Sequence, residues 1–105
     1  MKCVPCRKGD KPLSLAEIQQ KLAGLDGWVL NAEGKKIRKR WKFKNFAEAI
    51  SFVNRVAEVA EAEDHHPDVS FGWGYAEIVF TTHAIDGLHE NDFVMAREVD
   101  KSHEA

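Results

Sequence analysis

The stretch Glu61-Ala62-Glu63-Asp64-His65-His66-Pro67-Asp68 marks the point at which the periodicity of the chain changes. Before it, apolar residues recur at the three- and four-residue spacing of a helix, and after it they alternate as in a strand. Pro67 disfavours helical geometry at the residue before it, so the helix has ended by His66. Two adjacent histidines and four carboxylates therefore stand at a helix-to-strand junction.

The pattern before the junction predicts an amphipathic helix that runs to about Glu63. Asn45 can cap its start, and Glu48 follows three residues later, as in a capping box. The predicted buried stripe is a set of apolar residues spaced by three or four positions: Phe46, Ile50, Val53, Ala57 and Ala60, widened by Phe52 and Val56.

The pattern after the junction predicts two strands and a last helix. The first strand carries an alternating apolar set: Val69, Phe71 and Trp73. Gly72 and Gly74 indicate a bulge or a turn. The second strand covers residues 76–82 and is closed by His83, with Ile78, Phe80 and Thr82 on one face. Asp92 lies in the first turn of the last helix, whose core-facing residues are predicted to be Phe93, Ala96 and Val99.

The residues from 13 to 44 predict another helix followed by a hairpin. Ser14 and Glu17 form a capping box, and the helix that they start ends near Gly24. Strands over 28–30 and 35–43 are joined by a turn at 31–34. Residues 1–12 are interpreted as a tail and residues 13–105 as a single domain, since 105 residues leave no room for a second core.

The order α-β-β-α-β-β-α predicts an α+β fold, with a four-stranded antiparallel sheet and helices packed on one face. No apolar run approaches the roughly 18 residues of a membrane helix, and the expected location is the cytoplasm. The formal net charge is −2, which gives no general attraction to nucleic acid.

Two other features each leave two interpretations. Cys3 and Cys6 have a C-x-x-C spacing, which fits a reduced tail or half of a metal site shared between subunits. Seven cations lie within residues 35–44, which fits a surface for nucleic acid or an acidic protein, or a solvated strand face. The near-neutral total charge and the lack of an RNA-reading motif favour the solvated face.

Histidines suit acid–base chemistry because their ordinary pKa is the side-chain value nearest neutrality. Glu61 lies four residues before His65, on the same face of a continuing helix, where it can orient the imidazole. Asp64 and Asp68 can do the same for either histidine of the pair, and His83 can complete a pocket from a strand end. Two alternatives remain at this point: a surface histidine pair at a helix C-terminus, and a metal site. The metal ligands would be Glu61, His65, His66 and His83, although their spacing is no recurrent zinc signature.

The same residues resemble the signature of the pterin-4a-carbinolamine dehydratases. The signature is matched by Glu61-x-x-x-His65-His66-Pro67, followed by Trp73, His83 and Asp92, and the likeness extends from about Leu13 to Val99. It implies elimination of water from a 4a-hydroxytetrahydropterin to give quinonoid dihydropterin, without metal or cofactor. It also implies that His65, His66 and His83 are catalytic.

By the same resemblance, Glu61, Asp64, Trp73 and Asp92 bind substrate or tune the histidines, and Asp92 is expected to act more as a helix cap. The expected partners are a pterin substrate and further copies of the chain, as a homodimer or homotetramer. Some relatives of this family act without catalysis, by stabilising a transcription-factor dimer or assisting Rubisco assembly. A binding or assembly module is therefore the alternative function.

Overall fold

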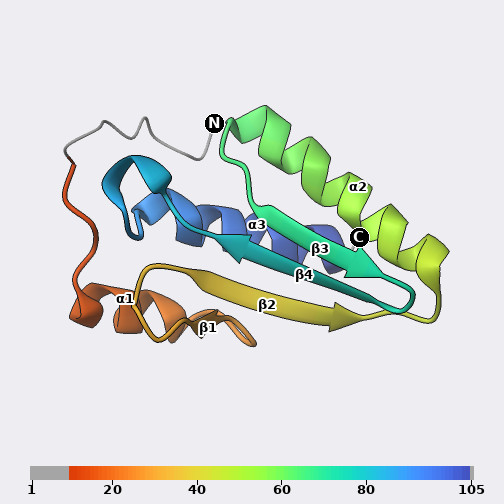
Figure 1. The fold of residues 1–105 in the computed structure, drawn as a ribbon, viewed down its shortest axis with the longest axis horizontal. Helices are drawn as coiled ribbons and strands as arrows, with labels where there is room; N and C mark the ends of the chain where they lie inside the picture. The colour runs from red at the N-terminus through yellow and green to blue at the C-terminus, as the bar shows by residue number, and fades with distance from the viewer. Residues whose placement is uncertain (1–9, 105) are drawn as a thin grey trace.

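A computed structural model describes residues 10–104 of the chain. The elements, in order, are α1 (Leu15–Leu22), β1 (Val29–Leu30), β2 (Ile37–Lys42), α2 (Phe46–Glu63), β3 (Asp68–Gly72), β4 (Tyr75–Phe80), the 3₁₀ helix η1 (His83–Ile85) and α3 (Glu90–Glu104) (Figure 1). The predicted α+β class and the predicted order of helices and strands are confirmed.

The four strands form one antiparallel sheet in the order β1-β2-β4-β3. Ile37 pairs with Phe80 and Trp41 pairs with Ala76, and all four side chains are buried. Directly opposite residues share a face, so these pairs define the core face of the sheet. Both long helices, α2 and α3, contact this sheet and each other (Figure 1). The core therefore lies between the sheet and these two helices.

The buried stripe of α2 differs from the one predicted. The residues of α2 that are fully buried are Ala49, Phe52, Val56 and Ala60. Phe46 is 44% exposed and Ala57 is also exposed, although both were expected to face the core. Apolar side chains cover more than half of this helix, so the spacing alone cannot decide which line faces inward. The larger ring of Phe52 packs between Trp41 and Phe43, which places its line of residues in the core.

The predicted helix starts and the predicted turn are confirmed. Ser14 and Glu17 bond reciprocally at α1 through side chain and backbone, at 3.0 and 3.2 Å. The Asn45 side chain accepts from the Glu48 N–H at 2.9 Å at the start of α2. Gly34 has a φ of 73°, which a residue without a side chain adopts at little cost, and it closes the turn between β1 and β2.

The face of β2 opposite to the core is basic and wet, as predicted. Lys36, Arg38, Arg40 and Lys42 are all exposed. Cys3 and Cys6, with most of the predicted tail, lie outside the described residues. Among residues 10–104, no helix combines the length and the apolar character that a membrane crossing requires.

Candidate active site

The junction after α2 turns the two adjacent histidines in different directions. Asp64 ends α2 in the left-handed region, with φ 51° and ψ 41°, and its N–H donates to the Ala60 carbonyl. Aspartate is one of the few side chains that adopt this conformation readily. The chain then leaves the helix axis, so that His65 faces α3 and His66 faces back toward α2.

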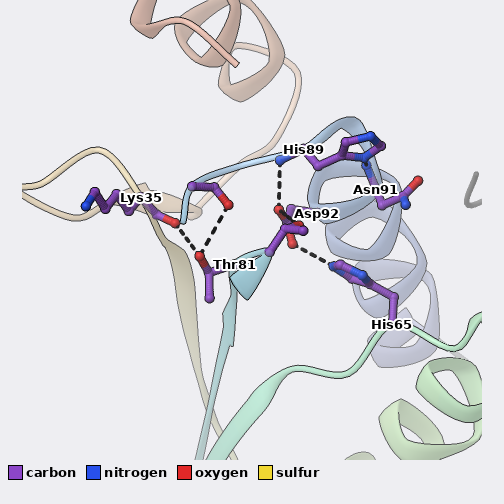
Figure 2. A network of polar contacts seen from close by, with 8 residues as sticks. Lys35, His65, Thr81, His89, Asn91 and Asp92 are labelled. Atoms are coloured by element: carbon purple, nitrogen blue, oxygen red, sulfur yellow. Dashed lines mark hydrogen bonds and ion pairs between the residues drawn. The ribbon is translucent and has the colours of Figure 1, made fainter. Parts of the chain in front are cut away.

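His65 binds a buried carboxylate. Its Nε2 lies 2.7 Å from Oδ1 of Asp92, on α3 (Figure 2). The His65 side chain is 14% exposed and that of Asp92 is fully buried. The imidazole also stacks on the ring of Phe80, with 6.0 Å between centroids and 16° between planes. Two elements thus fix the imidazole, one by its edge and one by its face.

Asp92 is held in turn by two further donors. The Thr82 hydroxyl donates to Oδ2 at 2.8 Å. The His89 backbone N–H donates to the same oxygen at 3.0 Å (Figure 2). A buried carboxylate is stabilised in its charged form by donors of this kind. Asp92 was expected to act more as a helix cap, and the structure gives it both tasks. It caps α3, and it holds His65.

This arrangement bears on which nitrogen of His65 can exchange a proton. A carboxylate that is ionised can only accept hydrogen bonds, so an ionised Asp92 requires a protonated Nε2 on His65 as its donor. In the neutral imidazole the other ring nitrogen, Nδ1, then has the lone pair. We therefore infer that Nδ1 of His65 is the nitrogen available for proton transfer.

Glu61 contacts His66 and not His65, which is a correction to the expected pairing. The Oε2 atom of Glu61 bonds to Nε2 of His66. The expected pairing assumed a helix that continues to His65, whereas the left-handed Asp64 interrupts it and moves His65 away. Both partners are exposed, 53% for His66 and 75% for Glu61, so this second carboxylate–imidazole pair is open to water.

His66 and Glu61 also line a groove of about 350 Å³ between α2 and β3. Its other walls are apolar: Val53, Val56, Ala57, Ala60, Pro67 and Val69. Sites for small molecules are commonly apolar clefts with a few polar groups, and this groove has that character.

Within residues 10–104, no hydrogen bond joins the remaining predicted residues to these two carboxylate–imidazole pairs. His83 is exposed at the start of η1, next in sequence to Thr82, and so close along the chain to the Asp92 network. Trp73 is 73% exposed in the turn after β3, whereas the histidines precede that strand. The five residues of β3 span about 17 Å, so Trp73 lies at the far end of this strand from His65 and His66. Within the described residues, the Asp64 carboxylate has no hydrogen bond to either histidine.

Two residues of this network were not predicted as site residues. Thr82 was assigned to one face of a strand, and no role was predicted for His89. A capping-box spacing with histidine in place of serine or threonine was the available signal. Within residues 10–104, no group of three or more His, Cys, Asp or Glu side chains is arranged to hold a metal ion.

Comparison with known proteins gives a consistent family. The family model described as "Pterin 4 alpha carbinolamine dehydratase" matches residues 11–102. A protein of Halorhodospira halophila named "Putative pterin-4-alpha-carbinolamine dehydratase" is 53% identical over 98 residues, covering 93% of this chain and 90% of its own. A protein of Rubrobacter xylanophilus with the same name is 50% identical over 99 residues, covering 94% and 92%.

Two solved structures are similar in fold. The structure titled a transcriptional coactivator/pterin dehydratase from Brucella melitensis has a TM-score of 0.83 and 32% identity, covering 88% of this chain and 98% of that one. A pterin dehydratase-like protein described as a RuBisCO assembly factor in the alpha-carboxysome has a TM-score of 0.65 and 22% identity, covering 75% and 92%. The second likeness supports the fold alone.

Proposed function

The chain belongs to the pterin 4 alpha carbinolamine dehydratase family, and on that premise we propose that it eliminates water from a 4a-hydroxytetrahydropterin. The product is the quinonoid dihydropterin, which can be reduced and used again by a pterin-dependent hydroxylase. The observation that carries the proposal is the His65–Asp92 pair, in which a fully buried carboxylate binds Nε2 of a largely buried imidazole.

The reaction requires two proton transfers. A base removes the proton from the ring nitrogen next to the carbinol carbon, and the electron pair forms a C=N bond. The C–O bond then breaks, and an acid protonates the departing hydroxyl to give water. Imidazoles can serve in both roles near neutral pH, typically contributing 10²- to 10⁴-fold to the rate.

The structure supports different tasks for the three histidines. His65 acts as the base through Nδ1, because Asp92 occupies its other nitrogen and stabilises the cation that forms. His66 is the better candidate for the acid, because its imidazole bonds to the Glu61 carboxylate and lines the apolar groove between α2 and β3. His83 is exposed, and we propose that it contacts the substrate.

A direct assay tests the proposal. The carbinolamine is generated with a pterin-dependent hydroxylase, and formation of the quinonoid product is followed by absorbance. We expect the purified protein to accelerate this step, and His65→Ala and His66→Ala to lose about 10²-fold or more while remaining folded. His103→Ala, at the opposite end of α3, is the control and should keep full activity. Wild-type protein without any acceleration would refute the proposal.

A binding or assembly module is the second candidate. The Brucella structure, whose title names a coactivator, supports it, as does an exposed aromatic cluster of this chain. Phe46 and Phe71 stack at 5.8 Å, and both are exposed together with Trp73. An inactive wild-type protein that still binds a partner through this cluster would support the second candidate. A dimer or tetramer and a cytoplasmic location are part of the proposal, and sedimentation and cell fractionation test them.

A further inference from the structure

His89 lies immediately before α3 and occupies the position of its N-cap. Its Nδ1 accepts from the backbone N–H of Asn91 at 3.0 Å, and its own backbone N–H donates to Asp92 at 3.0 Å. The Asp92 N–H donates back to the His89 carbonyl at 3.0 Å. This is a variant of the capping box, in which an imidazole nitrogen replaces the usual oxygen and accepts from the second residue of the helix rather than the third.

The first turn of α3 needs this cap because it is buried. Asn91 is 4% exposed and Asp92 is fully buried, so water cannot readily satisfy the backbone N–H groups there. An N–H group left without an acceptor in such a place is costly. The cap therefore keeps the start of α3, and the Asp92 backbone, in one position.

A histidine can serve as this cap in only one tautomer. Nδ1 accepts a hydrogen bond only while it is unprotonated, so the neutral His89 ring must carry its proton on Nε2. The cap is then connected to the candidate active site through one carboxylate. His89 fixes Oδ2 of Asp92, and the other oxygen, Oδ1, holds His65 (Figure 2).

We propose that His89 is a positioning residue, whose unprotonated Nδ1 caps α3 and thereby fixes Asp92 and, through it, the tautomer and orientation of His65. Its activity readout rests on the proposed dehydratase function, whereas its spectroscopic readout does not. The imidazole of His89 does not itself need to touch the substrate.

Paired substitutions separate positioning from bulk stability. His89→Ala removes the acceptor, and His89→Ser restores one at the same position. We expect the alanine variant to lower kcat, but by less than the loss of about 10²-fold expected for His65→Ala, because the base is displaced and not removed, and KM should be nearly unchanged. The serine variant should recover most of this loss. His103→Ala removes a histidine from the other end of α3 and should leave kcat unchanged.

Imidazole ¹⁵N spectra give the readout that is independent of activity. In the wild-type protein, Nδ1 of His89 should have the shift of an unprotonated nitrogen, and Nε2 of His65 that of a protonated one. The His65 signals should change in His89→Ala and return in His89→Ser. A protonated Nδ1 in wild-type His89, or unchanged His65 signals and kcat in a folded His89→Ala protein, would overturn the proposal. If His89→Ala does not fold, the ¹⁵N shifts of wild-type His89 and the kcat and His65 signals of His89→Ser still test the proposal. If the wild-type protein has no dehydratase activity, only the proposed function fails.

Discussion

Replacing Asp92 by asparagine should separate what this carboxylate does for the fold from what it does for His65. The side chain keeps its shape, and its amide oxygen can still accept from Thr82 and His89. The amide NH₂ replaces Oδ1, however, and it can only donate. His65 must then accept through Nε2, which moves its proton to Nδ1 and removes the lone pair that we assign to catalysis.

The size of the effect on stability follows from the three hydrogen bonds. Hydrogen bonds to a charged group contribute about 1.5–3 kcal/mol each, and neutral ones about 0.5–1.5 kcal/mol. In Asp92→Asn the bonds from Thr82 and His89 persist but become neutral, so the variant should lose about 2 kcal/mol of stability. Asp92→Ala leaves the His89 N–H and the buried Thr82 hydroxyl without the acceptor that they share, while the partly exposed His65 can reach water. We expect about 3–5 kcal/mol for the alanine variant.

Urea denaturation and the dehydratase assay together measure both consequences. With a urea m-value of about 1–1.5 kcal/mol/M, the asparagine variant should unfold at a midpoint lower by about 1.5 M. Its kcat should fall by about 10²- to 10⁴-fold, the share that general acid–base catalysis usually supplies. Native-like near-UV circular dichroism should show that the loss of activity is not a loss of fold.

Asp100→Asn is the matched control. Asp100 lies on the same helix and also accepts from two side chains, Lys39 at 2.8 Å and Trp28 at 3.1 Å. Asp100 bonds to neither His65 nor His66. Its substitution should lower stability by about 1–2 kcal/mol through its own two hydrogen bonds and leave kcat within about twofold. Wild-type kcat in a folded Asp92→Asn protein would refute the tautomer argument. If Asp92→Asn and Asp92→Ala were equally destabilised, the proposal that asparagine keeps the bonds from Thr82 and His89 would be refuted.

Three further outcomes are expected. Thr82→Val should cost about 2 kcal/mol in urea denaturation by removing one charge-assisted bond, and an unchanged midpoint would contradict this. Glu61→Gln should change the free energy of unfolding by less than about 0.5 kcal/mol, because its pair with His66 is exposed. It should also lower kcat, but by a smaller factor than His66→Ala, and a larger factor would contradict this ordering. The hydrogen bond from Lys35 holds the pKa of Asp86 below its ordinary value of 3.8. The small contribution of this pair to stability is therefore present above the pKa of Asp86 in the unfolded state and is lost as the pH falls through its pKa in the folded state. Lys35→Met should raise the pKa of Asp86 in an NMR titration, and an unchanged pKa would contradict this.

In β2 and β4, alternation predicted the buried face better than helical periodicity did in α2. In β3 it did not, because the predicted apolar set of Val69, Phe71 and Trp73 is exposed and Trp73 lies beyond the strand. In β2 and β4 each residue has one of two faces, so Ile37, Trp41 and Phe80 could be assigned to the core from the sequence. In α2 apolar residues occupy both candidate lines, and only the packing of Phe52 against two aromatic rings selects one. When apolar residues form two possible buried lines on a helix, the sequence pattern cannot select one, because the choice depends on the surface of the sheet against which the helix packs.

The histidine pair shows a similar limit. The sequence predicted that carboxylates would orient His65 and His66. It could not predict which carboxylate, because one left-handed residue, Asp64, changes the direction of the chain after α2. The His65–Asp92 bond joins residues 27 positions apart, so no local pattern contains it.

The two carboxylate–imidazole pairs should therefore respond differently to substitution. Asp92 joins the end of α2, Thr82 just beyond β4 and the start of α3, so the bonds that orient His65 also hold these elements together. Glu61 and His66 are exposed neighbours at one helix end, and nothing else in the described chain depends on their bond. Substitutions at His66 should reduce activity with little loss of stability, whereas substitutions at Asp92 should reduce both. If stability and activity instead fell together at His66, that pair would have to be structural, and the catalytic assignment of His66 would fail.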